Sequence, residues 1–279
     1  MIKIFLTVRN RLAITKKCIH ALKEHSKIKH KIYVYNNQTN YKLDEHFGYF
    51  YKLFEKGFIS QVSFLSDDST FNAFSKASAC NFFGLQHEQD PQKDKYNFMV
   101  MLDNDIIVTP GWDEQLHRAW SYIAEHKMRD IKVIGQLPGG IKYRQETVTI
   151  DKGENFIGRI GKLGGSGLWS VRPNFFTDVG FLNLRNLVGH NKKHDQLYWR
   201  LMDQSTSGKP YIMGINKKLG IHCGKQAGSV CNKLTRGPKK KQEKLEVIKF
   251  ERAEEMISQV DFKTFYEAVS NNKELLNDW

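Results

Sequence analysis

Apolar and polar positions along the first hundred residues predict short buried strands separated by amphipathic helices. Short continuous apolar runs predict strands at residues 2–8 (IKIFLTV), 30–36 (HKIYVYN), 61–66 (QVSFLS) and 96–102 (YNFMVML). Residues 11–25 and 72–86 carry apolar side chains at helical spacing. This order is typical of a mainly parallel α/β sheet with helices on its faces, in which ligands bind at the carboxyl ends of the strands.

The second half of the chain has a less regular pattern. It predicts strands at residues 131–137, 166–173 and 209–215, hairpins or a covering loop at 141–167, a helix at 193–208, and helices at 244–260 and 261–272. We therefore expect one domain over residues 1–223, a basic, mobile loop over 224–244 and a helical tail over 245–279.

The composition favours a folded protein of the cytoplasm. Hydrophobic residues make up 40% of the 279 positions, which is enough for a core. No apolar run approaches the ~20 residues of a transmembrane segment, and we expect the first residues to form a strand and not a signal peptide. Four cysteines lie far apart without a C-x-x-C pair, which indicates reduced thiols. The expected location is the cytoplasm of a bacterium or of a virus-infected host.

The charge of the chain favours an anionic partner. The formal net charge is +13, and residues 236–244 and 190–195 are local basic runs. Nucleic acid, an anionic membrane face or a phosphate-rich polymer would all be attracted. A lysine-rich soluble protein without such a partner is the alternative.

Two carboxylates, Asp103 and Asp105, stand where the fourth predicted strand ends. Side chains two positions apart in an extended strand point to the same side, so both could reach one cation. Mg²⁺ and Mn²⁺ take oxygen ligands, often one or two carboxylates together with substrate phosphates. The alternative is a pair of surface or helix-capping carboxylates.

The segment FMVMLDNDIIVTPGWDEQL (98–116) resembles the nucleotide-sugar-binding segment, with its DXD motif, of family-two-like glycosyltransferases. Four further segments resemble that family in the same order, namely residues 5–22, 33–40, 72–86 and 164–183. The resemblance runs from Ile2 to His222. It implies a GT-A fold, which is Rossmann-like with a mainly parallel mixed sheet and flanking helices, here followed by a C-terminal helical tail.

The resemblance also implies a donor site at the strand ends. It places Thr7, Val8 and Arg9 at the nucleotide base, Asn36 at the base or ribose, Asp68 and Lys76 near the base and diphosphate, and Asp103 with Asn104 at the ribose or sugar. Asp105 would bind Mn²⁺ or Mg²⁺ that bridges the diphosphate, and His222 would complete the metal site. Arg9 and Lys76 could instead be surface residues, and His222 a core or surface residue without a ligand.

The catalytic base departs from the pattern of the family. Inverting members carry an acidic pair at the start of a helix, where this chain has His194 and Asp195. We expect Asp195 to deprotonate the acceptor hydroxyl, with His194 as the rival and helix capping as the alternative role. Gly165, Ser166, Trp169 and Lys193 are the expected acceptor-side residues, with either Trp169 or its neighbour Leu168 facing the site.

The resemblance implies a metal-dependent glycosyltransferase that uses a nucleotide diphosphate-sugar, with a UDP-sugar and an inverting reaction favoured. The acceptor could be a hydroxymethylated DNA base, flipped from the duplex, or an anionic glycan at a membrane face. The alternative is a non-catalytic nucleic-acid- or sugar-binding protein on a degenerate transferase scaffold.

Overall fold

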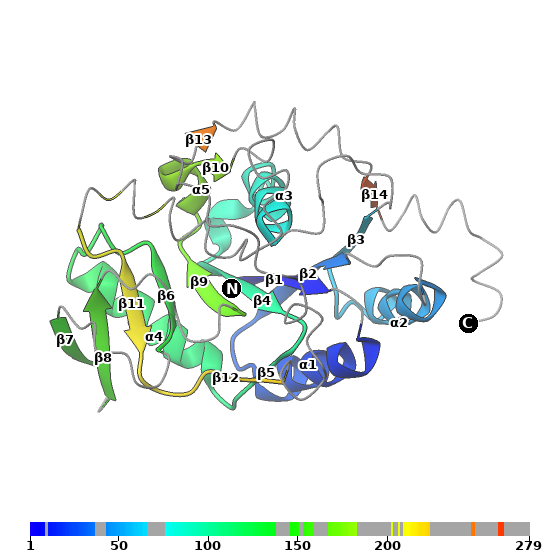
Figure 1. Ribbon diagram of the computed structural model, residues 1–279, viewed down its shortest axis with the longest axis horizontal. Helices are drawn as coiled ribbons and strands as arrows, with labels where there is room; N and C mark the ends of the chain where they lie inside the picture. The colour runs from blue at the N-terminus through cyan, green and yellow to red at the C-terminus, as the bar shows by residue number, and fades with distance from the viewer. Residues whose placement is uncertain are drawn as a thin grey trace, which may run out of the picture.

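A mixed sheet of ten strands forms the centre of the protein in the computed structural model (Figure 1). The structure describes residues 1–8, 11–36, 43–65, 76–137, 146–150, 153–158, 167–182, 202, 206, 209–223, 247–248 and 262–264. In spatial order the strands are β14 (Phe262–Thr264), β3 (Gln61–Leu65), β2 (His30–Asn36), β1 (Ile2–Val8), β4 (Phe98–Asp103), β9 (Leu168–Val171), β6 (Val133–Gln136), β11 (Ile212–Ile215), β8 (Gly153–Gly158) and β7 (Glu146–Ile150).

Strands β3, β2, β1 and β4 are parallel neighbours, so their carboxyl ends share one edge of the sheet. Strand β9 then runs antiparallel between β4 and β6, and β7 and β8 form an antiparallel hairpin at the far edge. The predicted strands at residues 2–8 and 30–36 are confirmed at both ends.

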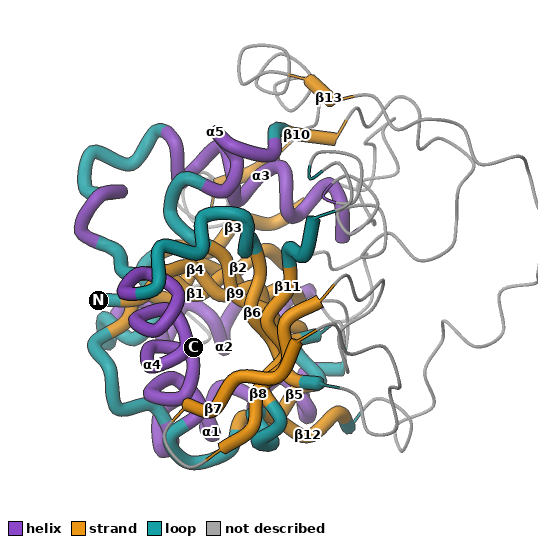
Figure 2. Tube along the Cα trace, turned by 90° about the vertical axis from the view of Figure 1, so that its left-hand side faces the viewer, coloured by secondary structure: helices purple, strands orange, loops and turns teal. Residues whose placement is uncertain are grey.

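Helices cover both faces of the sheet, which explains why the central strands are continuously apolar. The helices bounded within the described ranges are α1 (Leu12–His25), α2 (Leu43–Glu55), α3 (Lys76–Glu88), α4 (Trp112–Glu125) and α5 (Phe175–Val179), with a short 3₁₀ helix η1 (Lys93–Lys95). Figures 1 and 2 show α3 and α5 on one side of the sheet and α1 on the other.

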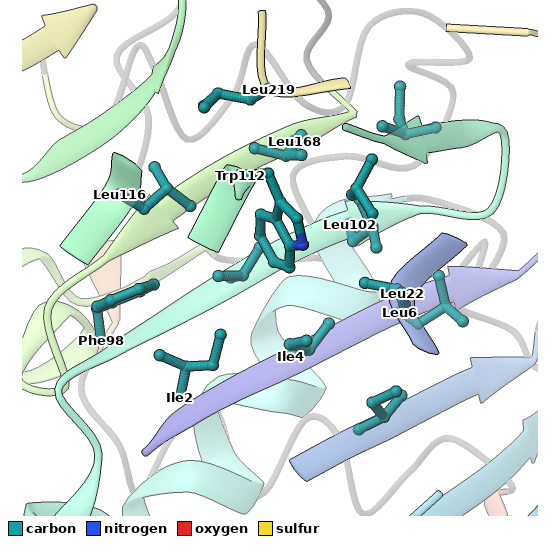
Figure 3. Packing of buried hydrophobic residues seen from close by; sticks show 14 of the residues in the cluster. Ile2, Ile4, Leu6, Leu22, Phe98, Leu102, Trp112, Leu116, Leu168 and Leu219 are labelled. Atoms are coloured by element: carbon teal, nitrogen blue, oxygen red, sulfur yellow. The ribbon is translucent and has the colours of Figure 1, made fainter. Parts of the chain in front are cut away.

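Side chains of β1 alternate between two hydrophobic cores. Ile4 and Leu6 belong to the larger core, which includes buried residues of α1, α2 and α4. Phe5 points to the other face, where its ring stacks on Phe83 of α3 at 4.4 Å between centroids. Figure 3 shows Trp112 of α4 lying over β4, near Leu168, in the larger core.

A small two-stranded sheet lies apart from the main one, close to α1 (Figures 1 and 2). It joins β5 (Ile106–Val108) to β12 (Gly220–His222) in antiparallel register. Because β5 directly follows the Asp103–Asn104–Asp105 turn, this pairing brings the far end of the domain beside that turn.

Two segments differ in secondary structure from the sequence-based analysis. The pattern analysis assigned no element to Leu43–Glu55, where α2 forms. In the predicted helical tail, the described residues are strands and not helices: β13 (Val247–Ile248) pairs with β10 (Phe181–Leu182), and β14 pairs with β3. A sheet edge binds a segment through backbone hydrogen bonds. A segment whose side chains have helical spacing can therefore still pair with such an edge.

Other expectations lie mostly outside the described residues. These are the basic loop 224–244, the remainder of the tail, and the helix 193–208 apart from Met202 and Thr206. In the described ranges, no helix has the length and apolar character needed to cross a membrane.

Candidate active site

The register of the parallel strands gathers four predicted donor-site residues at one edge of the sheet. Thr7 lies opposite Asp103 of β4, and the next residue, Val8, lies opposite Asn36 at the end of β2. The Thr7 hydroxyl donates a hydrogen bond to Asp103 Oδ1 at 2.8 Å. This bond fixes the Asp103 carboxylate at the carboxyl edge, where sheets of this kind bind ligands.

Backbone and side-chain hydrogen bonds hold the turn after β4. The Asp103 amide donates to Gly167 O at 2.8 Å, and the Asn104 amide donates to Thr7 O at 3.0 Å. The Asn104 side chain is buried and donates through Nδ2 to Thr15 Oγ1 on α1 at 2.8 Å. Asn104 therefore anchors the turn to the helix, a role that the sequence analysis did not assign to it.

Asp105 contacts two parts of the chain that are distant in sequence, near Arg11 and near His222. Its Oδ2 accepts a hydrogen bond from Arg11 Nη1 at 3.1 Å and lies 3.5 Å from His222 Nε2. The Asp105 carbonyl also accepts a bond from the Cys223 amide at 2.8 Å, which continues the β5–β12 pairing. The predicted neighbours Asp105 and His222 thus lie side by side.

Ile106, the residue after Asp105, fills the space between two glycines. A Cβ added at Gly167 would lie 2.7 Å from Ile106 Cδ1, and one added at Gly220 would lie 2.7 Å from Ile106 Cγ2. Carbon atoms pack at about 3.5–4.0 Å, so only glycine allows the two chain segments to approach Ile106 this closely.

The residues around Asp105 fit a divalent cation that shares its ligands with a substrate. Asp105 offers a carboxylate oxygen and His222 an imidazole nitrogen, both accepted by Mn²⁺. No cluster of three or more His, Cys, Asp or Glu side chains suited to a metal occurs among the residues that the structure describes. Mg²⁺ and Mn²⁺ commonly complete such sparse sites with phosphate oxygens and water.

The nearby Cys18 does not add a ligand. Its side chain is fully buried, and burial, followed by the negative charges of Asp105 and Asp103, raises the pKa of the thiol. Metals bind the thiolate, so Cys18 stays a protonated, apolar side chain, and its sulfur lies 3.8 Å from Asp103 O.

Asn36 is a buried polar side chain with unused hydrogen-bonding capacity. It is 0% exposed, and neither Oδ1 nor Nδ2 has a hydrogen-bond partner in the described parts of the chain. A buried amide without partners destabilises a fold by about 1–3 kcal/mol. Such a group at a ligand-binding edge suits recognition of a ligand by hydrogen bonds.

The remaining predicted residues have different outcomes. Val8 is 1% exposed and belongs to the larger core, and Lys76 is the first residue of α3. Seven predicted site residues lie outside the described ranges: Arg9, Asp68, Gly165, Ser166, Lys193, His194 and Asp195.

Trp169 requires a correction. The strand alternation predicted that either Trp169 or Leu168 would face an acceptor sugar, but they are 1% and 3% exposed. The two faces of β9 are both covered, so Leu168 enters the larger core and Trp169 packs edge-on against Phe175 at 6.2 Å between centroids. Trp169 is therefore a core residue, and its ring has no exposed face for stacking.

Arg11 is the site residue that the sequence analysis missed. It precedes α1 with φ 59° and ψ 51°, in the left-handed region. A basic residue directly before the first helix was the available signal, but its partner Asp105 lies 94 positions away along the chain.

Comparisons with known proteins support the architecture. No protein-family model and no curated protein matches the chain. Among solved structures, TarS of S. aureus superposes with a TM-score of 0.52 at 15% identity, covering 78% of this chain and 36% of TarS. The mannosyltransferase PcManGT from Pyrobaculum calidifontis, in complex with GDP-Man and Mn²⁺, gives a TM-score of 0.53 at 9% identity, covering 82% of this chain and 58% of PcManGT. The chain thus spans less than two thirds of either structure, and identities this low establish the fold alone.

Proposed function

We propose, from the premise that this chain has the GT-A glycosyltransferase fold, that it is a metal-dependent glycosyltransferase using a nucleotide diphosphate-sugar. The observation that carries the proposal is the position of Asp105 beside His222, next to the Thr7–Asp103 pair at the carboxyl edge of the sheet. Fold alone would leave function open, whereas a carboxylate–imidazole pair at this edge suits a metal–diphosphate complex.

Each residue of this edge has a proposed task. Asp105 and His222 would hold Mn²⁺ or Mg²⁺, which when bound neutralises charge on the nucleoside diphosphate leaving group. Thr7 orients Asp103 toward the ribose or sugar by its 2.8 Å hydrogen bond. Asn36 would pair its unused donor and acceptor with the base or ribose, and a UDP-sugar is the donor that we favour.

The acceptor half of the reaction is proposed from the sequence. Asp195 would remove the proton from the acceptor hydroxyl as that oxygen attacks the anomeric carbon, with His194 as the rival base, and the sugar would be transferred with inversion. Gly165, Ser166 and Lys193 would line the acceptor side. Asp195→Ala should abolish transfer but keep donor binding, and an unchanged rate would move the base to another residue.

The net charge of +13 favours a polyanionic acceptor. A hydroxymethylated base in DNA and an anionic glycan both have the required hydroxyl together with negative charge. Binding to DNA should weaken steeply with salt, since each phosphate contact releases counterions.

Calorimetric titration with a panel of nucleoside diphosphates and nucleotide-sugars, with and without Mn²⁺, tests the donor half. We expect one diphosphate class to bind in a Mn²⁺-dependent manner and Asp105→Asn to lose that dependence. A parallel titration with duplex DNA tests the acceptor. If the protein bound DNA but no nucleotide under any condition, it would be a non-catalytic binding protein on this scaffold.

A further inference from the structure

Arg11 is held at the mouth of the proposed metal site by the start of α1. Its carbonyl accepts hydrogen bonds from the Ile14 and Thr15 amides, both at 3.0 Å, and from Thr15 Oγ1 at 3.1 Å. Thr15 Oγ1 in turn accepts from Asn104 in the carboxylate turn. The backbone of Arg11 is therefore tied to the same turn that carries Asp105, although its φ of 59° is unfavourable for a residue with a side chain.

The side chain of Arg11 uses the oxygen that a metal ion would need. Arg11 Nη1 lies 3.1 Å from Asp105 Oδ2, and His222 Nε2 lies 3.5 Å from that same oxygen. A guanidinium is always charged. A divalent cation held between Asp105 and His222 would therefore face a like charge at close range, and the two cations would compete for Oδ2.

We propose that Arg11 is an exchangeable partner of Asp105. It neutralises the carboxylate while the site lacks a metal ion, and it moves to the diphosphate of the donor when a cation binds Asp105. This inference rests on the proposed function and deepens it. It adds Arg11 to the residues expected to bind the metal or the donor, and it gives Arg11 one role before the metal binds and another role afterwards.

Two properties of Arg11 suit this exchange. Its planar fork of N–H donors matches phosphate oxygens as well as a carboxylate. Its side chain is 22% exposed, against 14% for Asp105, so it can leave the carboxylate toward solvent without opening the core. The strained but hydrogen-bonded backbone keeps the side chain beside Asp105.

The exchange predicts effects of opposite sign for metal and for donor. Without the guanidinium, Asp105 is free for a cation, so Arg11→Gln should bind Mn²⁺ alone about tenfold more tightly. That factor corresponds to the lower end of the range for hydrogen bonds to charged groups. The same variant should bind UDP in the presence of saturating Mn²⁺ about tenfold more weakly, because one charged phosphate contact is lost.

The test is a titration of the purified full chain with Mn²⁺, followed by the loss of the free-ion signal in electron paramagnetic resonance. It is repeated for Arg11→Gln and for Lys17→Gln, a control that removes the same charge from an exposed position of α1. A second titration adds UDP, or the diphosphate that the nucleotide panel selects, at saturating Mn²⁺. Circular dichroism melts confirm that all variants fold.

Tighter Mn²⁺ binding together with weaker nucleotide binding, in Arg11→Gln only, supports the exchange. Equal Mn²⁺ affinity in wild type and Arg11→Gln overturns it, and the proposed function stands if Mn²⁺-dependent nucleotide binding remains. Nucleotide binding that needs Arg11 but is indifferent to Mn²⁺ also overturns it, since Arg11 would then replace the metal permanently. If no variant binds Mn²⁺ or any nucleotide, both the exchange and the proposed function fail.

Discussion

Replacing Gly167 by alanine should affect both the stability of the core and the affinity for the donor, and the two effects can be measured separately. A methyl group there would lie 2.7 Å from both Cδ1 and Cγ1 of Ile106 and 3.2 Å from Asp103 Oδ2. The first two contacts overpack the core. The third would displace the carboxylate that Thr7 holds by its 2.8 Å hydrogen bond.

The magnitudes follow from these two kinds of contact. Overpacking a well-packed core destabilises by about 1–3 kcal/mol, and replacing glycine by alanine recovers about 0.4–1 kcal/mol from the unfolded chain. We therefore expect Gly167→Ala to lower the free energy of unfolding by about 1–2 kcal/mol. Weakening the Thr7–Asp103 bond by about 1 kcal/mol should also reduce donor affinity about fivefold.

The assay needs a second overpacked glycine that lies away from the carboxylates. Gly84 of α3 serves, since an added Cβ there would lie 2.7 Å from two ring atoms of Phe176, in the core on the opposite face of the sheet. Urea unfolding measures stability, and titration with the nucleotide diphosphate at saturating Mn²⁺ measures affinity. Gly84→Ala should lose stability and keep wild-type affinity.

Two outcomes would refute the reasoning. If Gly167→Ala is destabilised yet binds the nucleotide as wild type does, the position of the Asp103 carboxylate does not matter for the donor. If Gly84→Ala loses affinity to the same extent, the loss reports general destabilisation and says nothing about the site.

Three further predictions address the metal, the strand-end pair and acid stability. Asp105→Asn should fold normally, because asparagine keeps the size of the side chain and an acceptor oxygen for Arg11. It should lose Mn²⁺-dependent nucleotide binding in calorimetry, and near wild-type Mn²⁺ dependence would show that the metal is held elsewhere. Thr7→Val keeps the shape of the side chain but removes the hydrogen bond to Asp103, so donor affinity should fall about tenfold, with an unchanged affinity excluding Asp103 from donor binding. Burial, followed by the charge of Lys3, lowers the pKa of His87 to about 4. The neutral imidazole therefore stabilises the fold fully above the unfolded pKa of about 6.5, and this stabilisation is lost as the pH falls toward 4. The total loss is about 3 kcal/mol. Urea unfolding should show the stability advantage of wild type over His87→Gln shrinking from pH 7 to pH 4.5, and a constant difference would contradict the shift.

Local patterns were sufficient for the central strands and for the carboxylate motif. Strands β1 and β2 were predicted at both ends because helices cover both faces of the sheet, which makes their sequences apolar without interruption. The carboxylates were recognised because they interrupt such a run at its carboxyl end. Parallel strands share an edge, so the expectation that Thr7 and Asp103 would lie at one end of the sheet required only that their strands run parallel.

Helix α2 and the C-terminal strands were beyond local patterns. The five described residues of the predicted tail pair with β10 and β3 through their backbones. Backbone pairing depends on which sheet edge remains open in the folded chain. The side-chain spacing of the segment does not indicate which edge that is.

The sequence by itself determined the α/β class, the strand ends that meet at the carboxyl edge of the sheet, and the presence of Asp103 and Asp105 there. Only the tertiary structure decided which side chains share that edge. The β5–β12 pairing brought His222 to Asp105, the left-handed start of α1 brought Arg11 to the same oxygen, and the double-sided burial of β9 removed Trp169 from the surface. The physical reason is the sequence distance between the contacting residues. Periodicity indicates which side of a segment packs against the core. Contacts between residues about a hundred positions apart depend instead on strand order, register and the volume that the neighbouring side chains leave.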